Sequence, residues 1–382
     1  MKILFVVKVN GNGVGGHYRS LRTIFEEVSK HENAEILVFG KTIPSAFSGI
    51  NVKTISIRKN IFKTLKEYKQ LLSDNNYDII HVFDITSLIF TKLIRKKNVV
   101  LNKCGGPNIY KYPVAPFMVV FSKENYDYYN SSDSFKKSTI KLIPNRVKQF
   151  SCDTKLIDSL KNELNINTED FVLLRIVRID KYYENSIKQS ILLTRKLQES
   201  NSEKNVKLLI IGGNTDKIFL EELNKFTEND KFIYIVTEDK YIKDAKLIID
   251  IADAVIGSGR GFMEACCRNK LLYAPISNSN LPVLVTENNF NYFFNFNFSE
   301  RAILPDELIE IEQDINKLRD LIPQYKIFTL NIFNSYFDIS KGVNSYLDLY
   351  KYILENKKKS VCWDKFSIYY LILILYKLIK NG

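Results

Sequence analysis

Residues 253–270, DAVIGSGRGFMEACCRNK, carry the strongest local signal in the chain. An apolar run ends at Ile256, three glycines follow at alternate positions, and a helix-forming stretch begins at Phe262. A strand, a glycine-rich turn and a helix in this order are typical of α/β proteins built on a parallel sheet. We therefore expect this turn at the carboxyl edge of such a sheet, where α/β proteins bind ligands.

The same turn carries groups that suit a phosphate and a sugar. Backbone N–H groups of Gly261 and Phe262 would point at an anion, and Arg260 would add positive charge. Glu264 could accept hydrogen bonds from two hydroxyl groups of a ribose. In the alternative interpretation, Glu264 is an acidic residue that suits the first turn of its helix and binds no ligand.

A second strand, glycine loop and helix stand at the N-terminus. Residues 11–20, GNGVGGHYRS, follow an apolar run and satisfy the GxGxxG pattern of dinucleotide-binding loops. That pattern also needs an acidic residue after the second strand, and residues 38–41 read VFGK. The loop, with Gly15, Gly16 and His17, is therefore predicted to contact a phosphate or sugar, and a tight structural turn is the alternative.

Apolar runs alternate with amphipathic stretches along most of the chain, which predicts βαβ units in two α/β halves. Two Rossmann-like domains are expected to face each other across a cleft, with a C-terminal helix returning to the N-terminal domain. The predicted domains are residues 1–150, residues 151–345 and a C-terminal helical segment at 346–382. The predicted strands are 2–9, 35–39, 78–83, 99–102, 117–121, 140–143, 171–177, 207–211, 232–236, 254–256 and 271–274; the predicted helices include 17–29, 60–73, 186–199 and 218–226.

The C-terminus combines basic and apolar residues. Three lysines at 357–359 precede Trp363, and residues 366–376 form an apolar run of 11 residues. A membrane-spanning helix needs about 20 apolar residues, so this run is too short to cross a bilayer. Two interpretations remain open: an anchor in the membrane interface, or a helix packed on the N-terminal domain.

Cationic residues follow the first strand of the second half. Arg178 and Lys181 stand in LLRIVRIDKYY, at the carboxyl end of residues 171–177. Cations at this position can bind a diphosphate and stabilise the charge that grows on it when a glycosidic bond breaks. Arg175 lies inside the strand and is interpreted as structural.

His81 and Asp84 stand where another buried strand emerges, in YDIIHVFD. His81 could bind a substrate there and orient or deprotonate a hydroxyl, since its pKa lies near neutrality. A hydrogen-bonded core histidine is the other interpretation.

Composition narrows the classes of protein. The 382 residues are 45% hydrophobic, which excludes a disordered or collagen-like chain. Five cysteines without regular spacing predict neither a disulfide framework nor a zinc site, and no signal peptide is expected, so a cytoplasmic protein is predicted. The net charge of +12 is concentrated in residues 1–150, which hold 24 basic and 11 acidic residues.

Together these motifs resemble the family 4 glycosyltransferases, which have the GT-B fold of two Rossmann-like domains. The resemblance covers nearly the whole chain and depends on the order and spacing of five segments. They are Gly15–Gly16, IPNRV at 143–147, VRIDK at 177–181, the strand with Gly212 and Gly213, and GRGFMEA at 259–265.

The resemblance implies particular roles, with an acceptor-binding domain at residues 1–150 and a nucleotide-sugar-binding domain at 151–345. Arg178 and Lys181 would bind the diphosphate of a nucleotide-sugar donor, Glu264 its ribose, and Gly213 would belong to the donor site. Transfer in this family retains the anomeric configuration, usually by a proposed front-face mechanism, and needs neither a metal nor a cofactor besides the donor, such as a UDP- or GDP-sugar.

The chain departs from the family pattern at four points. Ile256 stands where the first of two glutamates is common, eight residues before Glu264. Residues 103–106, KCGG, replace a frequent histidine, and Arg146 replaces the glycine of a PNG turn. Lys181 also follows Arg178 sooner than the usual lysine does.

The leading hypothesis is a hexosyltransferase at the cytoplasmic face of the cell membrane. It would move a sugar onto a lipid-linked oligosaccharide in surface polysaccharide, lipopolysaccharide or O-antigen synthesis, and its basic N-terminal half would contact an anionic membrane surface. A nucleotide-sugar 2-epimerase is the second hypothesis, and a basic nucleic-acid- or membrane-binding module without catalysis the third. Nucleic acid is not an expected partner, because no basic stripe with interleaved aromatic residues is evident.

Overall fold

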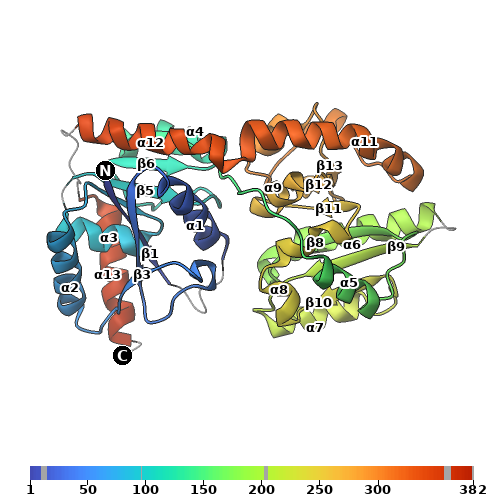
Figure 1. The fold of residues 1–382 in the computed structure, drawn as a ribbon, viewed down its shortest axis with the longest axis horizontal. Coiled ribbons are helices and arrows are strands. Elements are labelled where there is room, and N and C mark those ends of the chain that lie inside the picture. Colours follow the sequence, from blue (N-terminus) through green and yellow to red (C-terminus); the bar gives the residue numbers. More distant parts are fainter. Residues whose placement is uncertain (10–14, 96, 202–204, 357–362, 381–382) are drawn as a thin grey trace. The chain divides into compact units, whose positions relative to one another are not determined.

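The computed structural model describes residues 1–9, 15–95, 97–201, 205–356 and 363–380. The chain forms two compact units: unit 1 comprises Met1–Lys148 and Ile339–Gly382, and unit 2 comprises Gln149–Asp338 (Figure 1). The sequence predicts the corresponding boundaries at 150 and 345. Several residues of the predicted motifs lie outside the described residues: Gly11, Gly13, the lysines at 357–359 and one of the five cysteines, Cys362.

A parallel sheet of seven strands forms the centre of unit 1, in the order β3-β2-β1-β4-β5-β6-β7. Its inner strands are almost entirely apolar, as expected for strands covered on both faces. The order reverses between β1 and β4, so the ends of these two strands form the switch point of the sheet. The strands are β1 (Lys2–Lys8), β2 (Asn33–Phe39), β3 (Val52–Ile55), β4 (Ile79–Val82), β5 (Val99–Lys103), β6 (Phe117–Val120) and β7 (Thr139–Leu142).

Helices cover both faces of this sheet. Alternate residues of β1 belong to different cores: Phe5 packs with α1 and α12, whereas Leu4 packs with α2 and α3. Side chains of α13 join the second core, so α12 and α13 lie on opposite faces. The unit 1 helices are α1 (Gly16–Val28), α2 (Ile61–Asn75), α3 (Ile85–Ile94), α4 (Lys123–Ser131), α12 (Ile339–Glu355) and α13 (Lys365–Lys380), with short turns η1 (Ser45–Phe47) and η2 (Asp133–Phe135).

Unit 2 repeats the plan with six strands in the order β10-β9-β8-β11-β12-β13. Five strands are parallel, and the edge strand β13 is antiparallel to β12. The order reverses between β8 and β11. The strands are β8 (Phe171–Ile176), β9 (Val206–Ile211), β10 (Ile233–Val236), β11 (Ala254–Ile256), β12 (Leu271–Ala274) and β13 (Val283–Leu284).

The helices of unit 2 follow its strands as the βαβ pattern predicts. The predicted helix 186–199 lies within α6, and 218–226 lies within α7. Asp216 caps α7 by accepting a hydrogen bond from the Phe219 backbone N–H at 3.1 Å. The helical segments are α5 (Thr154–Glu163), α6 (Glu184–Ser200), α7 (Lys217–Phe226), α8 (Asp239–Ile242), α9 (Arg260–Cys267), α10 (Phe290–Asn295) and α11 (Ile315–Ile332), with η3 (Lys181–Tyr183), η4 (Ala245–Ile251), η5 (Asp306–Leu308) and η6 (Phe333–Phe337).

A buried ion pair attaches α13 to unit 1. The Lys92 side chain of α3 has no exposed surface, and its Nζ lies 3.1 Å from the Asp364 carboxylate and 2.6 Å from Ser367 Oγ. Asp364 also accepts hydrogen bonds from the backbone N–H groups of Phe366 and Ser367. Burial alone would raise the pKa of Asp364, but the hydrogen bonds and the charge of Lys92 outweigh it and lower the pKa.

We expect Asp364→Asn to detach α13 from the sheet, because it leaves the Lys92 ammonium buried without a carboxylate. Removing one partner of a buried pair costs on the order of 3 kcal/mol. Hydrogen exchange should show lost protection in α13 before the rest of unit 1. The double variant Lys92→Met, Asp364→Asn should recover much of the loss, and equal protection in wild type and Asp364→Asn would contradict this role.

Candidate active site

The donor-side residues predicted from sequence follow strands that are neighbours in unit 2. Because β9, β8 and β11 are parallel and adjacent, their carboxyl ends lie at one edge of the sheet. Residues 177–181 follow β8, Gly212 and Gly213 follow β9, and residues 257–260 follow β11. These segments therefore meet at the switch point, where open α/β sheets bind ligands.

The turn between β11 and α9 requires glycine. A Cβ atom on Gly257 would lie 2.7 Å from the Phe262 Cα atom, which no other residue could accommodate without a shift of the backbone. Gly259 has a φ of 50°, in the left-handed region. The Gly261 N–H donates to the Ser258 carbonyl oxygen at 3.1 Å. The sequence predicted that this N–H would point at an anion. In this conformation it is hydrogen-bonded within the turn.

Phe262 has a packing role in this structure. Its side chain is fully buried and its ring stacks on Phe298, with centroids 3.8 Å apart and planes 11° apart. The Phe298 carbonyl oxygen accepts a hydrogen bond from the Gly259 N–H. The segment around Phe298 therefore fixes the start of α9.

Arg260 and Glu264 are brought together one helical turn apart on α9. The Arg260 Nε donates to a Glu264 carboxylate oxygen at 2.8 Å. Both side chains are largely buried, which makes this pair stronger than an exposed ion pair. The carboxylate has a second oxygen, so it could accept a hydroxyl group while it keeps its arginine.

Arg178 and Lys181 are held by different carboxylates. The Arg178 Nε donates to the Asp180 carboxylate, and its guanidinium lies 5.3 Å from the Tyr183 ring centroid. The Lys181 Nζ lies 3.1 Å from both Glu184 and Glu222, and these hydrogen bonds raise its pKa. The Arg178 and Lys181 side chains are 47% and 58% exposed, so both can reach an anion at the sheet edge, and each would then share or release its carboxylate.

Arg175, which the sequence places inside its strand as a structural residue, is the buried arginine at this edge. Its side chain is fully buried and donates to the Ile256 carbonyl oxygen at 2.9 Å, to Ser186 Oγ at 2.9 Å and to Ser258 Oγ at 3.4 Å. Burial lowers its pKa to about 10, so the guanidinium stays charged at neutral pH. Arg175 thus joins β8 to the turn after β11. A lone arginine in an otherwise apolar strand was the available signal.

In unit 2, three buried side-chain atoms have no hydrogen-bond partner among the described residues: Arg175 Nε, Ser299 Oγ and Glu300 Oε2. Glu300 is close enough to Arg175 to oppose the lowering of its pKa. Glu300 thus places a carboxylate near this buried arginine.

The glycines after β9 differ in role. A Cβ atom on Gly212 would lie 1.6 Å from the Val177 carbonyl oxygen, so Gly212 permits the close approach of the β8 and β9 ends. Gly213 accepts a hydrogen bond from the Ile179 N–H at 3.0 Å, and a Cβ atom there would meet a side-chain atom of Ile242 only at 3.8 Å. Gly213 therefore fixes the path of the segment that carries Arg178.

In unit 1, Gly15, Gly16 and His17 begin α1, directly after the segment outside the described residues. Gly15 is the N-cap, and a Cβ atom on Gly16 would meet nothing within 4 Å. His17 lies against Tyr18, with ring centroids 3.8 Å apart, and burial lowers its pKa to about 4. At neutral pH His17 is therefore an uncharged donor and acceptor rather than a cation.

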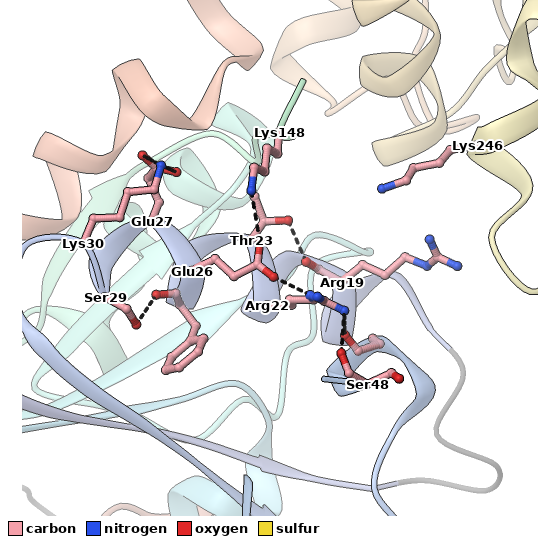
Figure 2. A network of polar contacts seen from close by, with 12 residues as sticks. Arg19, Arg22, Thr23, Glu26, Glu27, Ser29, Lys30, Ser48, Lys148 and Lys246 are labelled. Atoms are coloured by element: carbon pink, nitrogen blue, oxygen red, sulfur yellow. Dashed lines mark hydrogen bonds and ion pairs between the residues drawn. The ribbon is translucent and has the colours of Figure 1, made fainter. Parts of the chain in front are cut away.

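A polar network holds α1 in place on its solvent side (Figure 2). Arg22 pairs with Glu26 at 2.6 Å and donates to the carbonyl oxygens of Ala46 and Ser48 at 2.9 and 3.3 Å. Lys148 lies 3.8 Å from the same Glu26 carboxylate. The first helix after the glycine loop is thus tied to the turn at 45–48.

The structure favours the core interpretation of His81. The side chain is fully buried, and its Nδ1 is hydrogen-bonded to the Tyr350 hydroxyl of α12 at 2.8 Å. Phe5 and Phe83 lie beside its ring, and burial lowers its pKa to about 3. Asp84 is the N-cap of α3 and accepts a hydrogen bond from the Lys8 N–H at 2.7 Å.

A cavity of about 320 Å³ lies at the carboxyl ends of β4 and β5, and we call it the polar cavity because polar side chains share its lining with apolar ones. Lys103 is buried in its wall, and its Nζ donates to the carbonyl oxygens of Gly105 and Gly106 at 2.6 and 3.2 Å and to Asn125 Oδ1 at 3.2 Å. Asn102 Oδ1 is buried there without a partner among the described residues. The KCGG segment therefore lines this cavity, and the Lys103 ammonium is held by acceptors within its own unit.

Within the described ranges, no three His, Cys, Asp or Glu side chains are grouped so that they could hold a metal ion. The same ranges contain no helix whose length and apolar character would let it cross a membrane.

Solved structures with the same fold come from sugar-handling enzymes. A glycosyltransferase from Rickettsia africae matches with a TM-score of 0.66 and 17% identity, over 93% of this chain and 99% of that one. HepE (Alr3699) from Anabaena, solved in complex with UDP and glucose, matches at 0.62 and 14%, over 92% and 100%. A UDP-GlcNAc 2-epimerase from Neisseria meningitidis, bound to UDP-GlcNAc, matches at 0.53 and 13%, over 91% and 99%.

These likenesses define the class of fold. The chain has the GT-B glycosyltransferase-like fold, and the predicted pair of Rossmann-like domains with a C-terminal helix returning to the first is confirmed. No family model matches the sequence, and no curated protein matches it.

We expect Glu264→Ala to weaken binding of the matching nucleoside diphosphate by about tenfold, because two hydrogen bonds to a carboxylate are lost. Isothermal titration with UDP and GDP measures this affinity. Glu287→Ala, at an exposed position of the same unit, is the control and should bind as the wild type does. Unchanged affinity in Glu264→Ala would reject the ribose role and leave the Arg260 pair as purely structural.

Proposed function

We propose that this protein is a retaining, metal-independent glycosyltransferase that transfers a sugar from a nucleotide-sugar donor to a lipid-linked glycan. The observation that carries the proposal is the meeting of Arg178, the Arg260–Glu264 pair and the β11–α9 turn at the switch point of unit 2. A diphosphate needs cations there, and a ribose needs a hydrogen-bond acceptor. The family 4 resemblance assigns the same functions to Arg178 and Glu264.

The proposed donor site has a cationic side and a hydroxyl-binding side. Arg178 binds the diphosphate, and Lys181 adds to the positive potential after it releases a carboxylate. Glu264 holds the ribose while Arg260, Gly261, Phe262 and Gly213 shape the turn around it. UDP in the solved complexes of the same fold supports a nucleoside diphosphate as the ligand class.

The proposed reaction is a front-face substitution at the anomeric carbon. The bond from that carbon to the leaving phosphate oxygen breaks, and a bond to the acceptor oxygen forms on the same face. The acceptor proton passes to the leaving phosphate oxygen, so no separate base is needed. Arg178 stabilises the charge that grows on the diphosphate, which is where a positioned cation accelerates transfer most.

Unit 1 is proposed to hold the acceptor, with Gly15, Gly16 and His17 at its switch point. Unit 1 has 32 basic and 14 acidic residues, net +18, whereas unit 2 has 23 and 29, net −6. Such an excess suits a lipid-linked phosphate and an anionic membrane surface at the cytoplasmic face.

Helix α13 supports a membrane contact, because its two faces do different things. Ile374 and Leu378 pack against the core of unit 1, whereas Ile372 and Tyr376 are 59% and 60% exposed. The inner face fits the interpretation of a helix packed on unit 1, and the outer face is free for the proposed membrane contact. An apolar outer face with lysines at its end is typical of helices that lie in a membrane interface.

A nucleotide-sugar 2-epimerase remains the second candidate, because such an epimerase shares the fold. An epimerised sugar produced from the donor without any acceptor would favour it.

We expect Arg178→Ala to lower turnover about 100-fold or more while the thermal unfolding midpoint stays near that of the wild type, because the lost cation acts mainly on the transition state. The assay follows labelled sugar from the nucleotide donor into a lipid extract. Arg319→Ala, which removes an arginine from α11 of the same unit, should leave turnover intact. Near-normal turnover in Arg178→Ala would contradict its role.

We expect the protein to sediment with vesicles of anionic phospholipid at low salt, and Ile372→Asp, Tyr376→Asp to lose most of this binding, because charges then stand on the inserted face. Trp363 is the only tryptophan and lies just before α13, so its emission should shift to shorter wavelength on binding. Ile218→Asp, on an exposed apolar position of α7, is the control. No sedimentation of the wild type at low salt would contradict the membrane contact.

A further inference from the structure

A second hollow in unit 1, of about 480 Å³, separates α13 from the start of α3. Its walls are mostly apolar, and its cationic lining comes from three different parts of the chain. The apolar lining is Ile57, Ile85, Tyr370, Leu373, Ile374 and Leu378, and the polar lining is Lys8, Lys59, Thr86 and Lys377. We call this hollow the α13 groove.

The lysines of the α13 groove give it an electrostatic preference. Lys59 and Lys377 are exposed, and Lys8 ends β1 at the switch point of the sheet. None of the three forms an ion pair within 4 Å among the described residues. Lys8 nevertheless lies close enough to the Asp84 carboxylate for its charge to act on the pKa of that group. An apolar groove lined by three such cations suits an amphiphile with a phosphate rather than a neutral one.

The α13 groove also adjoins the polar cavity beside Lys103. Ile85 and Thr86, in the first turn of α3, line both hollows. A ligand that begins in the polar cavity can therefore continue past Thr86 into the apolar groove. The first hollow has a mixed polar and apolar lining and the second a mostly apolar one, an order that suits a glycan followed by a phosphate and an alkyl chain.

The outer face of α13 would continue the path of such a chain toward a bilayer. Ile372 and Leu375, next in sequence to groove residues, are 59% and 37% exposed. An alkyl chain that leaves the groove would thus remain on apolar surface.

We propose that the α13 groove binds the alkyl chain and the first phosphate of the lipid-linked acceptor. The inference rests on the proposed function, because it supplies the acceptor site of that reaction. Lys8, Lys59 and Lys377 hold the phosphate, the apolar wall holds the first part of the chain, and the polar cavity receives the glycan.

Isothermal titration of the full chain with dodecyl phosphate, below its critical micelle concentration, tests the groove directly. Dodecyl maltoside and inorganic phosphate are the comparison ligands. Dodecyl phosphate should bind at least about tenfold more tightly than either, because only it offers both the chain and the charge. Lys59→Glu, Lys377→Glu should weaken that binding by about tenfold or more.

Lys365→Glu, Lys380→Glu is the matched control, since it makes the same change of charge on exposed lysines that bracket α13 and do not line the groove. It should leave dodecyl phosphate binding unchanged, and both double variants should unfold at the wild-type temperature. Equal loss in both double variants, equal affinity for the maltoside, or binding only to anionic vesicles would each overturn the proposal. A thermal shift with nucleotide sugars separates the groove proposal from the transferase proposal. If nucleotide sugars bind but dodecyl phosphate does not, only the groove proposal is refuted. If dodecyl phosphate binds but no nucleotide sugar does, the transferase proposal is refuted.

Discussion

Buried Arg175 links the two strands between which the order of the second sheet reverses. Its guanidinium donates to the end of β11 at Ile256 and to Ser258 in the turn, while its own backbone belongs to β8. A buried charge is tolerated only where hydrogen bonds compensate its lost hydration, so the turn cannot move away without a large cost. Arg178, the Arg260–Glu264 pair and the start of α9 all depend on the position that this contact fixes.

In unit 1, too, polar groups gather where the strand order of the sheet reverses. The switch point between β1 and β4 collects the start of α1, Lys8 and the cap of α3 at one edge. The polar cavity and the α13 groove open beside that edge, and the excess positive charge of the chain belongs to this unit. Under the proposed function, unit 2 binds the nucleotide, and the positively charged unit 1 binds an anionic lipid-linked molecule.

The sequence predicted the elements well where they were long, apolar and followed by glycine. The strand and helix around residues 254–267 appear as β11 and α9. The strand that contains Arg175 and its two neighbours in the sheet were also predicted. It did not predict β3, whose four residues include Lys53 and Thr54, or α3, whose apolar start resembles a continuing strand. Such short elements carry too little periodicity to be identified from the sequence alone.

The site was harder to predict than the fold, because burial depends on distant partners. Tyr350, which is hydrogen-bonded to a His81 ring nitrogen, lies 269 residues away in α12. No residue near His81 in the sequence indicates this partner. The sequence predicts that Lys181 binds a phosphate, and only the fold shows that Glu222 of α7 pairs with it. Glu300 stands far from the family motif in sequence, and the fold alone relates it to Arg175.

The proposed function requires that unit 2 bind a nucleotide-activated sugar at the edge that Arg175 fixes. A thermal-shift series with UDP-, GDP-, CMP- and ADP-sugars measures this binding, because a ligand that binds only the folded state raises the unfolding temperature. We expect one nucleotide class to raise the midpoint in a concentration-dependent way, and Arg178→Ala to reduce that rise. No shift with any of the four classes at millimolar concentration would contradict donor binding by unit 2.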